Sequence, residues 1–252
     1  MNKIEVKVLN PQALGDAEKM MVCAARLTQR GEKIKDMKDF IALYDKPYAK
    51  STAEAMIHLP HPAIQKFGVI NVVVVGASRR FLAQITRHQN EVKFMSASLQ
   101  YSDYSGEADF VVPYELKDTL LEAAYLTQCR SSMAEYEKMV EHGADNDSAG
   151  YAAPQGLRNV LIISATMYQW RHMIGQRICR RNTSETRYVM LKIWAELFNY
   201  APDLFMPDST GCFCMRGLCL EGSKSCGDSV GVDMSPEDIL RADFPKYYEE
   251  VF

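Results

Sequence analysis

The chain has 252 residues with a formal net charge of −3 at pH 7, and 47% of its residues are hydrophobic while 24% are charged. These values are ordinary for a soluble globular protein and exclude intrinsic disorder and collagen-like repeats. So small a net charge gives no general attraction to nucleic acid or anionic lipid. We therefore expect an anionic partner to be a small phosphate-bearing ligand and not a nucleic acid polymer.

The hydropathy pattern also argues against a membrane protein. The longest strongly apolar run, 69–77, is far shorter than the roughly 20 residues that a membrane helix needs. The first residues alternate as a strand and show no secretory signal, so a cytoplasmic protein without membrane contact is expected.

Hydrophobic periodicity and capping residues predict a series of strands and helices. In chain order, these are a strand at 4–9, helices at 16–27, 36–44 and 51–59, a strand at 67–75, a helix at 78–89, an irregular loop, a strand at 108–112, a helix at 114–142, a turn at 143–150, a helix from about 154 to about 179 and a helix at 184–200. This order favours a single α+β domain over 1–252 with segregated layers. No G-x-G-x-x-G or Walker sequence supports a Rossmann or P-loop nucleotide site.

Polar side chains suited to ligand binding concentrate directly after the predicted strand 67–75. The segment Gln84-Ile85-Thr86-Arg87-His88-Gln89 is followed ten residues later by Ser98-Leu99-Gln100-Tyr101. The planar guanidinium of Arg87 suits a phosphate or the carbonyl edge of a heterocycle, and His88 can donate, accept or stack. An isolated Arg-His pair usually belongs to a solvated helix face, so the ligand hypothesis depends on matching segments elsewhere.

Four of the seven cysteines cluster in a Gly-rich and Ser-rich segment at 211–227. Their C-x-C-x4-C-x6-C spacing could close around zinc or an iron–sulfur centre. It matches neither common arrangement of two paired cysteines, so a regulatory disulfide and unligated thiols stay open. The four candidate ligands are Cys212, Cys214, Cys219 and Cys226.

Three separated groups of residues stand in a distinctive order. They are Ala24-Ala25-Arg26-Leu27-Thr28, then Ser78-Arg79 with Gln84-x-x-Arg87-His88 and Ser98-x-Gln100-Tyr101, and finally His172 with Arg177 and Glu185-x-Arg187. Together they resemble the flavin-dependent thymidylate synthases. In that family an Ala-Ala-Arg-Val-Ser-like segment comes early, and an R-H-R…S-x-R-Y signature follows the central strand. A late helix there ends in an arginine ahead of a Glu-Ile-Arg-like element. The order and spacing of these motifs match over most of the chain.

The resemblance implies a fold, an assembly and a reaction. It implies a thymidylate-synthase-complementing-protein-like α+β fold, with a central, mostly antiparallel sheet flanked by helices, in a homotetramer whose ligand sites lie where subunits meet. The implied reaction is reductive methylation of dUMP to dTMP, with FAD as cofactor and with methylenetetrahydrofolate and NADPH as co-substrates. In such enzymes the flavin carries the redox chemistry and the protein orients it and supplies charge.

The resemblance also implies roles for individual residues. Arg177 and Ser98 are the implied catalytic residues, because charged hydrogen bonds from Arg177 would stabilise negative charge developing on the uracil carbonyls and Ser98 would lie near the uracil. The implied flavin-binding residues are Thr28, Arg87, His88 and His172. The implied nucleotide-binding residues are Gln84, Arg87, Ser98, Gln100, Tyr101 and Arg177.

Several positions depart from the family pattern and keep other functions open. Gln89 and Gln100 replace signature arginines, Gly150 stands where another arginine is expected, and His61–Phe67 lacks a hydroxyl and a carboxylate of an upstream motif. A lost charge-assisted hydrogen bond in a buried site costs about 1.5–3 kcal/mol. Cations that could compensate, if they point into the site, are Arg79, Arg80, Lys93, Arg180 and Arg181. The alternatives are a divergent flavoenzyme acting on another nucleotide or substrate, and a non-catalytic homologue that binds metal through its cysteines.

Overall fold

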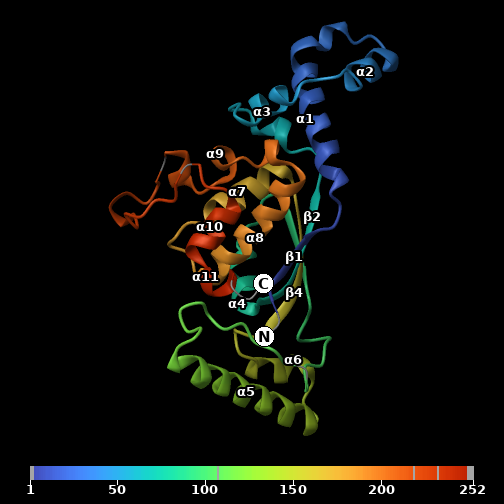
Figure 1. Cartoon of the computed structure of the whole chain (residues 1–252). Coiled ribbons are helices and arrows are strands. Elements are labelled where there is room, and N and C mark those ends of the chain that lie inside the picture. Colours follow the sequence, from blue (N-terminus) through green and yellow to red (C-terminus); the bar gives the residue numbers. More distant parts are fainter. Residues whose placement is uncertain (1–2, 107, 218, 232, 249–252) are drawn as a thin grey trace.

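The computed structural model describes residues 3–106, 108–217, 219–231 and 233–248, and it is built on one antiparallel sheet. Helices cover one face of the sheet, and helical extensions project from its two ends (Figure 1). The sheet has the strand order β1-β2-β4-β3. The strands are β1 (Glu5–Val8), β2 (Ile70–Ser78), β3 (Val92–Ser96) and β4 (Arg158–Ala165).

The helices fall into three groups along the molecule. One extension contains α1 (Gln12–Arg30), α2 (Met37–Tyr44) and α3 (Lys50–Ile57), and the other contains α5 (Leu120–Glu141) and α6 (Asn146–Ala149). The body contains α4 (Arg79–Ile85), α7 (Met167–Arg177), α8 (Ser184–Tyr200), α9 (Pro207–Thr210), α10 (Pro236–Asp243) and α11 (Pro245–Tyr248). Short 3₁₀ turns connect them at Gly31–Lys33, Pro62–Gln65, Gly150–Ala152, Pro202–Leu204, Phe213–Arg216 and Gly222–Lys224. None of the described helices is both long and apolar enough to cross a bilayer.

The predicted helix from about residue 154 is wrong in its first half. Residues 158–165 instead form β4, which pairs antiparallel with β2 on one side and β3 on the other. A short apolar run is ambiguous between helix and strand, and β-branched residues favour a strand that has neighbours on both sides. The helix begins only after Thr166, whose side chain caps α7 by accepting a hydrogen bond from the Gln169 amide.

Other boundaries in the middle of the chain also differ from the prediction. Residues 92–96 form β3 where an irregular loop was expected, and the predicted strand 108–112 reduces to one bridge between Phe110 and Leu157. The helix predicted at 78–89 ends at Ile85, so His88 lies in the turn beyond it. The predictions of β1, β2, α1, α2, α3 and α8 are confirmed with small shifts at their ends.

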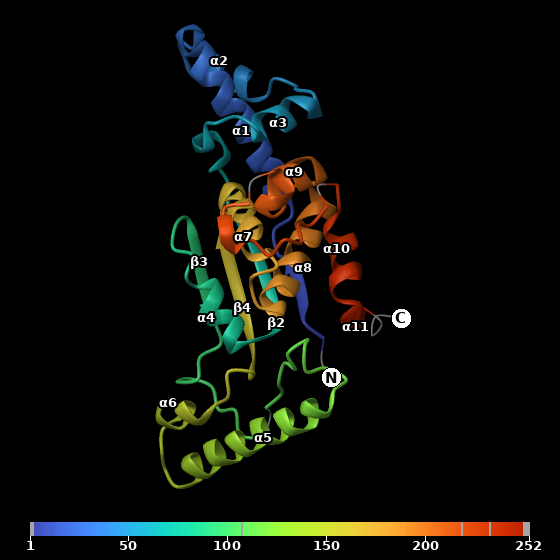
Figure 2. The same ribbon diagram turned by 90° about the vertical axis from the view of Figure 1, so that its left-hand side faces the viewer.

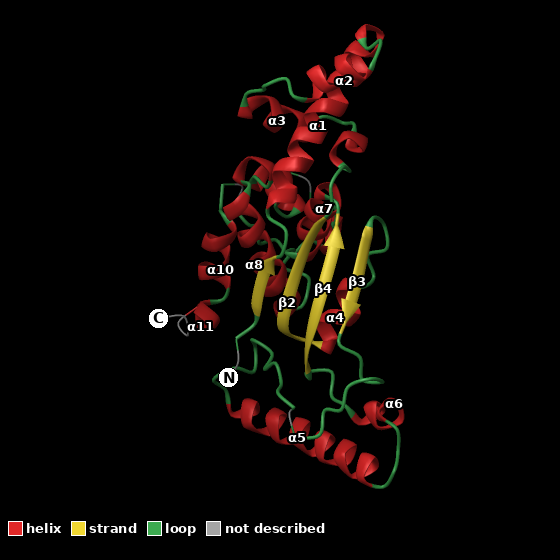
Figure 3. Cartoon of the chain, turned by 90° about the vertical axis from the view of Figure 1, so that its right-hand side faces the viewer, coloured by secondary structure: helices red, strands yellow, loops and turns green. Residues whose placement is uncertain are grey.

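The two faces of the sheet have different surroundings. On the inner face, Val72 and Ile163 are fully buried, together with Trp170 of α7 and Trp194 of α8. The outer face is open to the viewer in Figure 3, where the helices lie behind the strands. Large apolar side chains on the strands remain exposed there, namely Val75, Met95, Val160 and Ile162.

A buried carboxylate fixes the junction between β2 and α4. Glu185 at the start of α8 accepts hydrogen bonds from the backbone N–H of Ser78 at 2.7 Å and from its hydroxyl at 2.5 Å. Ser78 in turn caps α4 by accepting from the Phe81 amide. This network holds α4 against α8, and after α4 the chain returns to the sheet as β3 (Figure 2).

Candidate functional site

Four of the residues expected to bind ligands converge between the turn after α4 and the helix α7. The Nε–H of Arg177 donates to Nε2 of His88 at 2.8 Å, and the rings of His88 and His172 meet edge to face with centroids 6.2 Å apart. Arg87 lies close enough that its charge lowers the pKa of Arg177. We call Arg87, His88, His172 and Arg177 the basic cluster.

Local structure explains how the basic cluster forms. After α4 ends, the hydroxyl of Thr86 donates to the Leu82 carbonyl and the amide of His88 donates to the Ile85 carbonyl at 3.2 Å. This tight turn carries the imidazole of His88 inward, where the residue is 8% exposed, while Arg87 stays exposed. Arg177 is the last residue of α7, so its long side chain can reach back to the turn.

The electrostatics of the basic cluster favour an anionic or electron-accepting ligand. Burial, with help from the charges of Arg177 and His172, lowers the pKa of His88 to about 4, so its imidazole is neutral near pH 7. Burial and then Arg216 lower the pKa of His172. Burial and then the charge of Arg87 lower the pKa of Arg177, so its positive charge is destabilised at this position. A bound ring whose carbonyl oxygens gain negative charge would accept hydrogen bonds from Arg177 and so stabilise its positive charge.

Gln84, another expected nucleotide contact, has a structural role within one chain. Its side-chain oxygen accepts from the hydroxyls of Thr186 at 2.7 Å and Thr183 at 3.3 Å. These bonds connect α4 to the first turn of α8, which strengthens the same junction that Glu185 holds.

The expected residues Ser98 and Gln100 lie elsewhere, in a cavity of about 500 Å³ that we call the Ser98 cavity. The Ser98 hydroxyl accepts from the Gln100 amide at 3.0 Å. Arg79 also lines this cavity, and its buried Nη1 has no hydrogen-bond partner among the described residues. The sequence predicts Arg79 only as one of five cations that could replace the missing signature arginines. The structure places it beside two expected nucleotide contacts, Ser98 and Gln100.

Gly150, which stands where the family pattern has an arginine, also lines the Ser98 cavity. A Cβ atom at this position would approach the Cβ of Leu99 to 3.2 Å, tighter than ordinary packing. A side chain at residue 150 would therefore require the Leu99 side chain to shift by a few tenths of an ångström.

The remaining expected residues are not brought to the basic cluster within one chain. Tyr101 is 83% exposed. Thr28 is exposed on the last turn of α1, where its hydroxyl donates to the Ala25 carbonyl at 2.8 Å, and α1 belongs to the extension remote from α4 (Figure 1). The predicted site therefore divides into separate surfaces of one subunit.

The cysteine segment forms the wall of a larger cavity of about 780 Å³, which Arg177 also lines. All four predicted ligands, Cys212, Cys214, Cys219 and Cys226, face this cavity as free thiols. Within the described part of the chain, however, no three His, Cys, Asp or Glu side chains are arranged to hold a metal ion. The zinc or iron–sulfur centre therefore stays a prediction from the cysteine spacing, which the arrangement of the described thiols does not support.

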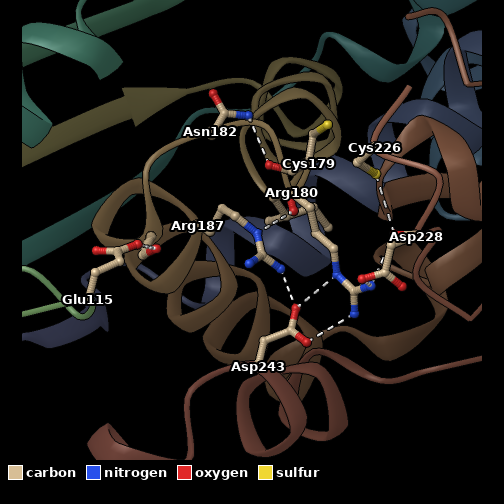
Figure 4. A network of polar contacts seen from close by, with 10 residues as sticks. Glu115, Cys179, Arg180, Asn182, Arg187, Cys226, Asp228 and Asp243 are labelled. Atoms are coloured by element: carbon tan, nitrogen blue, oxygen red, sulfur yellow. Dashed lines mark hydrogen bonds and ion pairs between the residues drawn. The ribbon is translucent and has the colours of Figure 1, made fainter. Parts of the chain in front are cut away.

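The thiols bond instead to nearby groups, and ion pairs hold the segment in place. Cys226 donates to the Asp228 carbonyl at 3.4 Å, and Arg180 bonds to Asp228 and to Asp243, which also pairs with Arg187 (Figure 4). Cys219 donates to the Ser225 hydroxyl, also at 3.4 Å. Arg181 pairs with Glu221 at 3.0 Å. Arg180 and Arg181 are thus committed to anchoring the C-terminal segment and not to replacing the missing signature arginines.

Comparisons with known proteins agree with the geometry. The family model described as "Thymidylate synthase complementing protein" matches residues 11–203. A flavin-dependent thymidylate synthase from Geobacter sulfurreducens is 22% identical over 229 residues, which cover 90% of this chain and 96% of that protein.

Two solved structures share the fold. Thymidylate synthase X from Helicobacter pylori, solved with FAD and dUMP, superposes with a TM-score of 0.61 at 17% identity, covering 82% of this chain and 99% of the other. The UMP/dUMP methylase PolB from Streptomyces cacaoi, solved with 5-Br dUMP, gives a TM-score of 0.64 at 13% identity over 84% and 96% of the two chains. Since the family match spans most of the sequence, this chain belongs to the thymidylate synthase complementing proteins, the family of the flavin-dependent thymidylate synthases.

Proposed function

We propose that this chain is an FAD-dependent thymidylate synthase that reductively methylates dUMP to dTMP. The observation that carries the proposal is the convergence of Arg87, His88, His172 and Arg177 from two distant segments in a member of this family. Neutral imidazoles beside guanidinium donors fit a flat ring whose carbonyl oxygens accept hydrogen bonds. When bound there, the flavin supplies the redox chemistry.

The chain's own residues have distinct roles in this proposal. Arg87, His88 and His172 bind and orient the flavin, with Thr28 supplied from another subunit. Arg177 uses its Nε to bond to His88, and in this proposal its two Nη groups donate to a uracil carbonyl. Its charge stabilises the electron density that collects on the uracil as C5 reacts, so it acts as the main catalytic residue together with Ser98.

The Ser98 cavity is the proposed nucleotide pocket. Ser98, Gln100 and Tyr101 would contact the nucleotide, with Gln84 holding the adjoining junction, and Arg79 would bind the 5′-phosphate. The free Nη1 of Arg79 supports this role, because a buried donor without an acceptor is costly until a ligand provides one.

A homotetramer with sites at subunit interfaces is part of the same proposal. The expected ligand contacts of one chain lie on separate surfaces, so a complete site would require a second subunit. The open outer face of the sheet, with Val160 43% and Ile162 41% exposed, offers an apolar surface for such contacts. Methylenetetrahydrofolate and NADPH are the proposed co-substrates, and the cytoplasm is the proposed compartment.

A second candidate substrate is UMP or another pyrimidine nucleotide. It is favoured by the exchange of signature arginines for Gln100 and Gly150, which changes the pocket around the phosphate and sugar. The similarity of fold to a UMP/dUMP methylase is consistent with it. The non-catalytic metal-binding alternative has no support in the described residues, because no metal-binding group forms there.

The test combines complementation with assays of the purified protein. Expression in a bacterial strain that lacks thymidylate synthase should remove its need for thymidine, and the purified protein should show the visible absorbance of oxidised flavin. With methylenetetrahydrofolate and NADPH, dUMP should yield dTMP. A yellow protein that methylates only UMP would favour the second candidate, and a colourless, inactive protein would refute both.

A further inference from the structure

A separate cavity of about 380 Å³ lies between the end of α3 and one face of α7, closed by α9 and the turn 213–216. Tyr168, Arg171 and His172 stand at positions i, i+3 and i+4 on α7, so they line one side together. Other polar residues around it are His58, Asp208, Ser209 and Arg216. We call this cavity the Arg171 pocket.

Arg171 is buried in this pocket, and no carboxylate of the described residues pairs with it. The residue is 5% exposed, and its Nη2 donates to the side-chain oxygen of Gln65. The amide group of Gln65 is itself fixed by donating to the carbonyls of Met56 and Ile57, both at 3.0 Å. The partner of Arg171 is therefore a neutral, pre-positioned oxygen, and Nη1 of Arg171 has no acceptor among the described residues.

Arg216 enters the same pocket from the C-terminal segment. Its Nε donates to the Gly211 carbonyl at 3.0 Å, and its guanidinium lies 5.3 Å from the centroid of the Phe213 ring. Its Nη2 is also buried and, within the described chain, without an acceptor. A Cβ atom on Gly175, one turn after Arg171, would lie 2.8 Å from this nitrogen, so the glycine makes room for the guanidinium.

The pair of cations is not neutralised by the acids nearby. Burial, then the charge of Arg216, lowers the pKa of Arg171 to about 10, and burial lowers that of Arg216. Asp208 acts favourably on Arg216, but its carboxylate lies 3.6 Å from Nε2 of His58 and carries no hydrogen bond to either arginine. A buried and a partly buried guanidinium group that repel each other, each with one buried nitrogen that has no acceptor among the described residues, are expected to be stabilised by an anion.

We propose that the Arg171 pocket binds an anionic oxygen group, a phosphate or a carboxylate, between Arg171 and Arg216. A guanidinium donates in a planar fork that matches both groups, and each of the two arginines has one nitrogen that could donate to such a group. Tyr168 acts electrostatically on both arginines and so lies close to the bound group. The pocket shares His172 with the basic cluster, which places the anionic group beside the proposed flavin site.

The test measures ion binding to the full chain without nucleotide or added flavin, so its result is independent of the proposed catalytic function. Isothermal titration with inorganic phosphate and, separately, with acetate distinguishes the two sources of the anionic group, and chloride at matched ionic strength is the blank. We expect saturable binding of one of the two ions. Arg216→Gln should weaken it at least about tenfold, as expected for loss of a charge-assisted hydrogen bond.

Two further variants complete the design. Arg181→Gln is the matched control, because Arg181 lies between α7 and α8, pairs with Glu221 and does not line this pocket, so the variant should bind the ion as the wild type does. Gly175→Ala keeps both charges but displaces the Arg216 guanidinium, so it should also weaken binding. Equal affinity of Arg216→Gln, Arg181→Gln and the wild type, or no saturable binding of either ion, would overturn the proposal.

Discussion

Nε of Arg177 donates a hydrogen bond to Nε2 of His88 across 2.8 Å, which requires that His88 Nε2 carry a lone pair. The imidazole is therefore neutral, with its proton on Nδ1. We expect ¹⁵N NMR to show this tautomer and to place the pKa of His88 at about 4, below its ordinary value of 6.5. In Arg177→Ala the pKa should rise, because a neighbouring positive charge is removed.

The low pKa of His88 also predicts how stability changes with pH. In the unfolded chain His88 takes up a proton near its ordinary pKa of 6.5, whereas in the folded chain it does so only near 4. Between these values the unfolded state binds more protons, so the free energy of unfolding falls as the pH falls through this window. Thermal melts of the wild type and of His88→Gln should diverge in it, and parallel curves would contradict the assignment.

Variants of the basic cluster should separate catalysis from cofactor binding. Arg177→Ala is expected to lower the rate of methyl transfer at least about 100-fold, because it removes the donor that stabilises charge on the pyrimidine, while part of the flavin stays bound. His88→Ala should instead release flavin, measured as loss of visible absorbance on gel filtration. Unchanged turnover in Arg177→Ala would remove this residue from the mechanism.

Arg79 should determine the affinity for the nucleotide. Arg79→Gln removes the proposed phosphate contact in the Ser98 cavity, and we expect KM for dUMP to rise about 10- to 100-fold with a smaller change in kcat. Arg80→Gln is the control, because the Arg80 side chain bonds to Gln155 at 3.0 Å and lies outside this cavity. An equal rise in KM for dUMP in both variants would indicate that nucleotide affinity depends on the overall positive charge of this region and not on a contact with Arg79.

The buried carboxylate of Glu185 should stabilise the fold. Glu185→Ala leaves the Ser78 N–H and hydroxyl without their acceptor, at an expected cost of about 1–3 kcal/mol in the free energy of unfolding. Glu185→Gln keeps an acceptor oxygen and should cost less. Burial raises the pKa of the Glu185 carboxyl group, and the hydrogen bonds from Ser78 act in the opposite direction. Denaturant titrations would measure the free energy of unfolding of both variants. Equal losses in Glu185→Ala and Glu185→Gln would contradict the expectation that the alanine variant loses more.

The cysteines should differ in reactivity in an order set by their surroundings. Cys219 is exposed, and the Ser225 hydroxyl, which can donate to the thiolate, lowers the pKa of the Cys219 thiol, whereas burial raises the pKa of Cys212 to about 12. With limiting iodoacetamide we expect Cys219 to be alkylated well before Cys212, because the thiolate is the nucleophile. Mass spectrometry of the digested protein gives the order directly, and preferential labelling of Cys212 would be incompatible with this fold of the segment.

Elements with clear hydrophobic periodicity and the motifs of the basic cluster could be predicted from the sequence. Contacts between distant segments could not. The apolar run at 160–163 is compatible with a strand or a helix. It forms a strand because β2 and β3 provide hydrogen-bonding neighbours on both sides. Likewise, the motif around Gln84 predicts ligand binding, yet the hydroxyls that hold it come from α8, about 100 residues later.

The candidate site likewise combines contacts that the sequence predicts with contacts that depend on the folded structure. Arg177 and His88 were expected together from their motifs, whereas nothing local predicts that Arg79 would enter the cavity of Ser98 while Arg180 and Arg181 bind acids of the C-terminal segment. The cysteine spacing suggested a metal centre, but side-chain direction decides whether thiols converge, and spacing does not determine it.

The position of β4 in the sheet has a consequence for how the protein is made. β2 and β3 are separated by 13 residues in the chain, yet they never pair with each other and are joined only through a strand that begins at Arg158. During synthesis the ribosome must therefore deliver the whole of α5 and α6 before the sheet can assemble, and the nascent chain until then can pair only β1 with β2. Closing so long a loop costs entropy before it gains contacts, which makes the completion of this sheet a late step of folding.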